Sequence, residues 1–365
     1  MDVIGRFLLN ILRVIGFVFL PILVLSSFSD RVSPLVCVWF SYLGLFFPFI
    51  LLVNIFFACF FILLGRWKTV MVYAVVFLLC WNAVRTYFPV HFRNREVPEG
   101  CIKLLTYNVM HFDGFRKDRK GSNAILNYIR DSEADIVCLQ EYGYSTDGIH
   151  LSESDIIGAL KRLPYHHFDR FGSSGKSVYG IAVFSKYPFS RTEKLSYPSR
   201  NNGSVIVELD VGGRKLTVIN NHLESNGLSV DDRAGFYDLT SHPDTEKFES
   251  FTHLLRNRLS SAFKARARQA EVIAEAISRN GNPYVIVCGD FNDTPISYVR
   301  HSIGSGLDDA FVETGFGPGI TYNRQRFLFR IDHILHSSNI KAYDCTIGNL
   351  RNSDHYPVSC LLKFD

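Results

Sequence analysis

The sequence predicts a helical membrane segment followed by an α/β domain with a layered sheet architecture. Apolar residues dominate the first 95 of the 365 positions. From Glu99 onward the chain changes to short strand-like runs separated by turns, with few helical patterns between them. Many strands with few intervening helices are typical of sheets that pack in layers.

The N-terminal part contains apolar runs long enough to cross a hydrocarbon core, which needs roughly 20 such residues. We expect spans at about residues 8–28, 35–64 and 69–88, and we assign residues 1–95 to a transmembrane anchor. Arg13 interrupts the first run and Pro21 bends it. More membrane-length runs follow, which favours an anchor over a cleaved signal peptide.

Positive charges in the short loops predict the orientation of this anchor. Arg6 and Arg13 precede the first span, and Arg66 and Lys68 separate the second from the third. This pattern favours a cytoplasmic N-terminus. After three crossings, the C-terminal domain of this integral plasma or inner membrane protein would be extracytoplasmic. Losing one crossing reverses the prediction, and the arginines after the third span favour the opposite orientation.

Residues 99–365 form the second expected domain. A helix is expected at 124–130, and a helical insertion at about 224–279, where Phe248, Phe251, Leu255 and Leu259 recur every three or four residues. The expected strands cover residues 102–107, 136–140, 180–185, 205–209, 216–220, 284–288, 330–335 and 357–362.

Acidic, amide and imidazole side chains stand at the ends of these strands. They are Asn108, Glu141, His222, Asp290, Asn292, Asp332, Asp354 and His355. Each has an ordinary explanation alone, such as a turn former or a histidine packed beside the sheet. However, ending a strand requires no carboxylate, and a sheet that aligns these ends gathers the groups at one edge. Together they predict a metal-assisted hydrolase, with oxygen ligands for a hard cation and groups that handle a proton.

Six sequence blocks carry a family resemblance. They are Leu105-Thr106-Tyr107-Asn108, Cys138-Leu139-Gln140-Glu141, Asn221-His222-Leu223, Gly289-Asp290-Phe291-Asn292, Arg330-Ile331-Asp332-His333-Ile334 and Ser353-Asp354-His355-Tyr356-Pro357-Val358. Their order and nature resemble the signature blocks of the endonuclease/exonuclease/phosphatase superfamily, over about residues 102–365. The resemblance implies a DNase I-like four-layer α-β-β-α sandwich with a divalent-metal phosphoesterase site at one sheet edge.

The resemblance also implies a ligand set. Glu141 would be the main metal ligand, with Asn108 and Asp354 completing or supporting the site. Hard oxygen ligands suit Mg²⁺, which takes one or two protein carboxylates and keeps several waters. Mn²⁺ or Ca²⁺ could take its place.

The remaining groups receive catalytic roles from the same resemblance. Asp290 would orient or deprotonate the attacking water, and Asn292 would bind a phosphate oxygen. His355, oriented by Asp332, and His222 would face the phosphate and stabilise the charge of the transition state.

Two features stay open. The family's DNase-type members carry a further acidic residue between the second and third blocks, for which Asp169, Glu193 and Glu208 are candidates. Two basic clusters could contact phosphate or form solvated surfaces. They are Arg256, Arg258, Lys264, Arg266 and Arg268, and Arg324, Arg326 and Arg330.

The sequence therefore favours a membrane-anchored, metal-dependent phosphoester hydrolase. A membrane-tethered DNase-like endonuclease is the alternative, and a non-catalytic scaffold is a weaker one. The net charge of +4 is too small to indicate nucleic-acid binding by itself. The expected partners are the lipid bilayer and a phosphoester that is lipid-linked, small or part of a nucleic acid. No protein partner is predicted.

Overall fold

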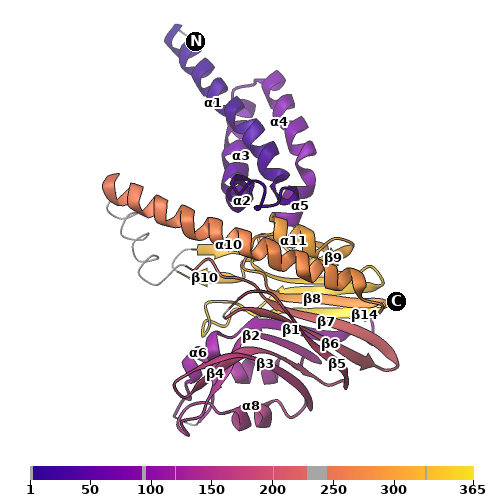
Figure 1. Ribbon diagram of the computed structural model, residues 1–365. Coiled ribbons are helices and arrows are strands. Elements are labelled where there is room, and N and C mark those ends of the chain that lie inside the picture. The colour runs from indigo at the N-terminus through magenta and orange to yellow at the C-terminus, as the bar shows by residue number, and fades with distance from the viewer. Residues whose placement is uncertain (1–2, 93–95, 120, 200, 228–244, 325–326) are drawn as a thin grey trace.

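The computed structural model describes residues 3–92, 96–119, 121–199, 201–227, 245–324 and 327–365 (Figure 1). The side chains of residues 3–6, 245–255 and 327 are outside this description. Parts of two expected segments also lie outside it, namely residues 93–95 of the anchor and 228–244 of the insertion, as does Arg326. The N-terminal helices stand together at one side of a larger domain of sheets and helices.

The N-terminal segment consists of short and long helices. They are α1 (Val3–Ser27), the 3-10 turn η1 (Ser29–Arg31), α2 (Trp39–Leu45), α3 (Phe47–Leu63), α4 (Trp67–Leu79) and α5 (Trp81–Tyr87). One uninterrupted stretch, Phe7–Arg31, is long and apolar enough to cross a membrane. The other two expected spans are broken, because α2 and α3 meet at a 62° bend and α4 and α5 at a 66° bend.

The described residues thus contain one clear span where hydropathy predicts about three, and each bent pair would add one only if its two helices cross together. The breaks let α2 and α5 lie on the sheet domain at the base of the helices (Figure 1). In α2, a Cβ on Gly44 would come within 2.2 Å of the Ile296 carbonyl oxygen. Tyr42, also in α2, donates a hydrogen bond to the Arg256 carbonyl at 2.8 Å. Hydropathy measures the length of an apolar run but not its direction, so the sequence pattern does not reveal these bends.

Two six-stranded sheets form the core of the described C-terminal domain. The first sheet has the order β13-β14-β1-β2-β4-β3, and the second has the order β5-β6-β7-β8-β12-β9. The strands of the first sheet are β1 (Ile102–Asn108), β2 (Ile136–Ser145), β3 (Tyr165–Ser174), β4 (Ser177–Ser185), β13 (Ile340–Ile347) and β14 (Val358–Phe364). Those of the second are β5 (Phe189–Leu195), β6 (Gly203–Val211), β7 (Arg214–His222), β8 (Tyr284–Asp290), β9 (Leu307–Asp309) and β12 (Asp332–Ser337). A separate hairpin pairs β10 (Tyr322–Arg324) with β11 (Phe327–Phe329).

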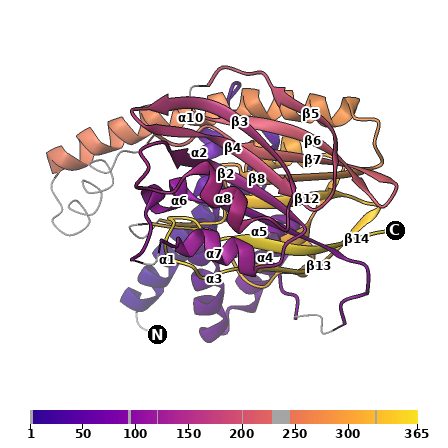
Figure 2. The ribbon, with the colours of Figure 1, turned by 90° about the horizontal axis from the view of Figure 1, so that it is seen from below.

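The sheets pack face to face and helices cover both outer faces. The helices on these faces are α6 (Met110–Phe115), α7 (Ala124–Asp131), α8 (Glu153–Ala159), α10 (Thr245–Arg279) and α11 (Tyr298–Ile303). A further helix, α12 (Ala310–Thr314), contacts strands of both sheets and packs into the core between them. Buried side chains of both sheets, including Leu104, Val183, Val218 and Ile286, form the central core. Figure 2 shows α7 and α8 on the outer face of the first sheet, and Figure 1 shows α10 along the second. This arrangement is the expected four-layer α/β sandwich.

The sequence pattern finds the central strands better than the edge strands. All eight expected strands are present with shifted ends, and α7 and α10 overlap the two expected helices. The edge strands β3, β5 and β13 were not expected. Their residues are largely polar and partly exposed, since an edge strand needs no continuous apolar run.

Strand register brings the predicted site residues to one end of the sandwich. The parallel pair β1–β2 places Asn108 opposite Gln140, directly before Glu141. The parallel pair β7–β8 places His222 opposite Asp290, and the antiparallel pair β8–β12 places Asp290 opposite Asp332. Because the two sheets face each other, their polar strand ends meet across the sandwich.

Candidate active site

The centre of the site is an amide that joins two carboxylates from different sheets. Asn108 Nδ2 donates hydrogen bonds to Glu141 Oε1 at 3.2 Å and to Asp290 Oδ2 at 3.1 Å. Asn108 Oδ1 accepts a hydrogen bond from the backbone nitrogen of Met110. Asn108 is buried, so its amide fixes the spacing between the strand ends of the two sheets.

Local backbone geometry turns these carboxylates into the site. Glu141 has a left-handed φ of 47° at a β-bulge where the pairing of β2 with β4 shifts register. Gly289, directly before Asp290, has a φ of 122°, and a Cβ there would come within 2.1 Å of the Asn221 carbonyl oxygen. Such conformations concentrate at functional sites, where the surrounding structure holds them in place.

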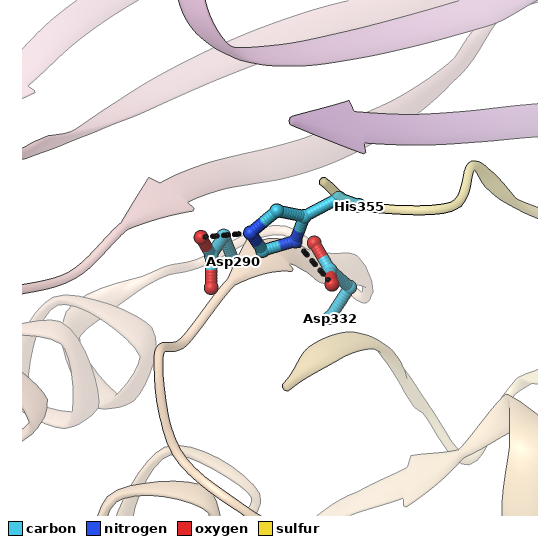
Figure 3. Close-up of side chains that lie close together, drawn as sticks. All are labelled: Asp290, Asp332 and His355. Carbon is cyan, nitrogen blue, oxygen red and sulfur yellow. Dashed lines mark hydrogen bonds and ion pairs between the residues drawn. The ribbon is translucent and has the colours of Figure 1, made fainter. Parts of the chain in front are cut away.

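His355 lies between two aspartates (Figure 3). Its Nδ1 is 2.8 Å from Asp332 Oδ2, and its Nε2 is 3.6 Å from Asp290 Oδ2. All three side chains are buried. Burial acts to lower the pKa of His355, but Asp332 and Asp290 outweigh it and raise the pKa to about 10. The imidazole therefore carries a proton near neutral pH.

His222 approaches the same carboxylates from β7. Its Nε2 lies 3.8 Å from both Glu141 Oε1 and Asp290 Oδ2. Burial acts to raise the pKa of Glu141, but His222 and the next imidazole, His111, outweigh it and hold the pKa below its ordinary value. Glu141 is therefore anionic at neutral pH. In contrast, burial raises the pKa of Asp290, helped by Asp332 and opposed by His355.

The last two predicted residues border this cluster. Asn292, with a left-handed φ of 52°, donates from its backbone nitrogen to Asp290 Oδ1 at 2.8 Å. Its side chain donates to the Leu223 carbonyl at 2.9 Å. Asp354 Oδ2 is 3.2 Å from Arg324 Nη1, and the Asp354 charge acts on His355. The structure thus brings all eight predicted residues into one connected group.

Sequence reasoning missed a left-handed turn beside the site. Met110, His111, Phe112, Asp113 and Phe115 all have positive φ. Left-handed backbone costs roughly 1–2 kcal/mol for each residue with a side chain, so this turn is held by its surroundings. The turn brings His111 Nε2 to 3.9 Å from Glu141 Oε2. A His next to a Phe gives no sequence signal for such a turn.

Sequence reasoning also missed Tyr322 in β10, which lies beside Arg324. The Tyr322 ring lies edge-on to His355 at 5.1 Å, and Arg324 pairs with Asp354. Arg324 belongs to a basic cluster that the sequence links to the site. The other described member of that cluster, Arg330, points elsewhere because it is buried against α5, where it donates to the Thr86 carbonyl. The interpretation of Arg330 as a substrate contact is therefore wrong.

The basic cluster on α10 also contains both a buried arginine and exposed basic residues. Arg266 is fully buried, and it donates to Asp293 Oδ2 at 3.1 Å and to the Glu224 carbonyl at 2.8 Å. It supports the loop after β8 and is not available to phosphate.

Lys264 and Arg268 are exposed. Arg256 is exposed as well, and its spacing of eight and four residues places it on one side of the helix with Lys264 and Arg268. Arg258 donates a hydrogen bond to the Gly227 carbonyl. The exposed members therefore form a solvated basic face, and no described contact links this face to the site.

Three acidic residues were candidates for a further member of the site, and all three form ion pairs outside the cluster of eight residues. Glu193 and Glu208 both contact Arg191 on the exposed edge strand β5. Asp169 lies 3.5 Å from His167 on β3. None of the three has a contact with the eight clustered residues among the described interactions.

Two sets of described side chains carry the atoms that could hold a divalent cation. Asp290, Asp332 and His355 offer ligand atoms within 4.8 Å of one another. However, a protonated His355 already pairs with Asp332, so this trio suits proton handling better than metal binding. Glu141 keeps 32% of its side chain exposed and Asp354 keeps 17%. These two carboxylates supply the hard, accessible oxygen atoms that Mg²⁺ prefers.

Comparison with protein families gives two matches along the chain. A model described as the Endonuclease/Exonuclease/phosphatase family matches residues 105–355. A model described as Domain of unknown function (DUF8431) matches residues 9–87. No curated protein matches the chain.

Several solved structures resemble the sheet domain. The human nocturnin catalytic domain with bound sulfate has a TM-score of 0.51 at 18% identity, covering 76% of this chain and 97% of its own. A Leptotrichia buccalis C-1013-b protein of the endonuclease/exonuclease/phosphatase family has a TM-score of 0.48 at 18% identity, with 72% and 100% covered. TDP2 from D. rerio, complexed with a single-strand DNA product, has a TM-score of 0.47 at 16% identity, with 73% and 100% covered. The likeness to nocturnin shows a shared fold.

Proposed function

The chain belongs to the endonuclease/exonuclease/phosphatase family, and from this premise we propose that it is a membrane-anchored, divalent-metal-dependent phosphoester hydrolase. The main support is the Asn108 amide, which holds Glu141 and Asp290 together across two sheets. Beside it, the buried His355 imidazolium is held in place by its hydrogen bond to Asp332 and offers a charged donor. A fold alone would require neither feature.

Glu141 would hold the cation, with Asn108 and Asp354 supporting it. Mg²⁺ is the ion that best suits these oxygen donors, and Mn²⁺ or Ca²⁺ could replace it. When bound, the ion supplies Lewis-acid stabilisation of charge on the phosphoryl oxygens. The lowered pKa of Glu141 supports this assignment, because the carboxyl must be ionised to bind metal.

Asp290 would act on the attacking water. Its carboxylate would accept a proton from the water as the water oxygen bonds to phosphorus. The bond between phosphorus and the ester oxygen then breaks, and the departing alkoxide takes a proton from solvent or from an imidazolium. The raised pKa of Asp290 supports this role, because a base works best when its pKa approaches the ambient pH.

His355, His222 and Asn292 would stabilise the negative charge that grows on the phosphoryl oxygens. His355 is oriented by Asp332, whose Oδ2 accepts a hydrogen bond from Nδ1 of the imidazolium. A fixed cationic donor needs no reorganisation during the reaction, which makes such preorganised groups effective. The Asn292 side chain lies beside Asp290, where it could reach a bound phosphate.

The N-terminal helices would anchor the enzyme in the plasma or inner membrane. The continuous apolar stretch Phe7–Arg31 supports this proposal. If both bent helix pairs also cross, a cytoplasmic N-terminus places the catalytic domain outside the cytoplasm. A cytoplasm-dependent fluorescent reporter fused after Asp365 should then stay dark, whereas a bright signal would reverse the orientation.

An activity screen tests the proposed chemistry. Full-length protein in detergent would be given phosphomonoesters, phosphodiesters, phospholipids and plasmid DNA, with Mg²⁺ or with a chelator. We expect turnover of at least one class that requires Mg²⁺ and falls at least about 100-fold in Glu141→Gln. Glu133→Gln, on the surface beside Arg162, is the matched control. Equal activity of Glu141→Gln and Glu133→Gln on every substrate would contradict the assignment.

A further inference from the structure

A small cavity opens next to His222, at the edge between the two sheets. It has a volume of about 190 Å³ and is lined by residues of β5, the segment between β5 and β6, and β3. The lining includes Phe171, Lys194, Ser196, Ser199, Asn202 and Gly203. No role in metal binding or proton transfer falls to any of these residues.

Asn202 connects this cavity to the proposed reaction centre. Its Nδ2 donates to the Leu223 carbonyl at 2.8 Å and lies 3.4 Å from His222 Nε2. The same His222 nitrogen faces Glu141 and Asp290. Strand pairing fixes the connection, because Gly203 lies opposite His222 in the β6–β7 register. Asn202 therefore borders both the cavity and the position of a phosphoester bound at His222.

The volume limits the size of that group. A water molecule occupies about 30 Å³ in the liquid, so the cavity has room for roughly six waters. This space fits a single ring of six or so heavy atoms with small substituents. A base pair or a lipid chain would extend beyond the cavity into solvent.

The lining selects a neutral group with many hydroxyls. Ser196, Ser199 and Asn202 bring both donors and acceptors, and the Lys194 ammonium adds donors. Ser199 Oγ also donates to Glu224 Oε2 at 2.9 Å, which places a carboxylate behind the wall and offsets the lysine charge. A group with a second negative charge would therefore gain less than a neutral polyol.

The Phe171 ring forms the aromatic wall of the cavity, and Lys194 already covers one face of this ring. The Lys194 ammonium lies over the Phe171 ring, 5.0 Å from its centroid. A Cβ on Gly203 would come within 2.6 Å of the same ring, so the ring packs closely on β6. A nucleobase would have to displace the ammonium to stack on Phe171, whereas hydroxyl groups can use Lys194 where it stands.

We propose that this cavity is the leaving-group subsite and that it receives one polyhydroxylated ring, such as a hexose. The inference rests on the proposed phosphoester hydrolysis and names its substrate class. The ring is released as the free alcohol when the bond between phosphorus and its oxygen breaks and that oxygen gains a proton. Lys194 and Asn202 act as specificity-determining residues.

Esters with different leaving groups test the subsite. Full-length protein with Mg²⁺ would be assayed on the phosphomonoester and the methyl phosphodiester of glucose, adenosine and p-nitrophenol. In Lys194→Met and Asn202→Ala we expect kcat/KM to fall about tenfold or more for the glucose esters and less than about threefold for the p-nitrophenyl esters. Lys215→Met, on an exposed lysine near the opposite end of β7, should change neither.

Two results would overturn the proposal. One is an equal fall for all three leaving groups, which would mean that the variants disturb the reaction centre. The other is a preference for adenosine esters that Phe171→Ala removes, which would make the cavity a base-stacking site.

A binding measurement separates failure of the subsite from failure of the proposed function. Saturation-transfer NMR with methyl glucoside should give a signal with the wild-type protein that is lost in Lys194→Met. If no ester is hydrolysed but this signal is present, the proposed function and the leaving-group role fall, and the cavity stands only as a sugar-binding site. If esters are hydrolysed and the signal is missing from the wild-type protein, the subsite falls alone.

Discussion

The guanidinium of Arg330 donates a hydrogen bond to the backbone carbonyl of Thr86, linking α5 of the N-terminal segment to the strand that carries Asp332. Arg330 is buried, and it lies over the Phe311 ring, 4.6 Å from its centroid. It precedes Asp332 by two positions. The helical segment and the candidate site are therefore parts of one packed structure near this arginine.

Replacing Arg330 should destabilise the protein. Arg330→Met removes a buried cation whose carbonyl partner and nearby Asp309 would be left less well compensated. We expect a loss of about 3 kcal/mol, which for a domain of this size lowers the Tm by roughly 6–12 °C. Thermal unfolding in detergent, followed by near-UV circular dichroism, measures this. Arg130→Met, which alters an exposed arginine, should leave Tm within about 2 °C, and an equally small change in Arg330→Met would contradict the prediction.

Asp309 should make stability depend on pH in the acid range. Burial acts to raise the pKa of Asp309, but Arg300 and Arg330 outweigh it and lower the pKa to about 2. A lowered pKa stabilises the fold above the unfolded value of about 3.9, and this contribution disappears as the pH falls toward 2. The free energies of unfolding of the wild type and of Asp309→Asn would be measured from pH 5 to pH 2. The difference between the two should shrink by about 2 kcal/mol over this range. A constant difference over this range would show that the Asp309 charge does not stabilise the fold.

The Asp332–His355 pair should behave as one unit in catalysis. Asp332→Asn and His355→Gln should each lower kcat by about 100-fold or more. The double variant should lose little beyond the larger single effect, because each change removes the same oriented imidazolium. His150 is exposed and pairs with the partly buried Asp147 at 2.5 Å, and His150→Gln should leave kcat unchanged. Multiplicative losses at Asp332 and His355 would mean that the two residues act independently.

Variants of a buried and an exposed arginine of α10 should distinguish a role in supporting the fold from a role in binding nucleic acid. Arg266→Met should reduce both stability and activity, because Arg266 holds Asp293 directly after Asn292. Arg268→Met, on the exposed face, should leave activity and its salt dependence unchanged. If Arg268→Met instead weakens only DNA cleavage and flattens its salt dependence, the endonuclease alternative would gain support.

The central strands were predictable because buried parallel strands produce continuous apolar runs. β1, β2, β7 and β8 all show this pattern. β1, β7 and β8 end at Asn108, His222 and Asp290, whereas β2 continues past Glu141 to Ser145. The edge strand β5 has no such signal, because much of it is exposed. The left-handed turn at His111 was unpredictable for another reason. It is stabilised by distant contacts such as the Asn123 amide, which donates to the Phe112 carbonyl.

The positions of the basic side chains also could not be predicted from local sequence patterns. Arg324 and Arg330 are six positions apart and look alike in the sequence. Only packing sends Arg324 to Asp354 and buries Arg330 beneath α5. The bends in the N-terminal helices also follow from packing, since α2 and α5 turn to contact the sheet domain.

The sequence by itself determined the order and chemical kind of the polar groups at the strand ends, because alternation and apolar runs are local properties of the chain. The tertiary structure decided which groups meet. Asn108 reaches Asp290 across 182 positions, and Asn202 brings a cavity to His222. Such pairings depend on how two whole sheets stack, which is a property of the complete domain and of no single segment.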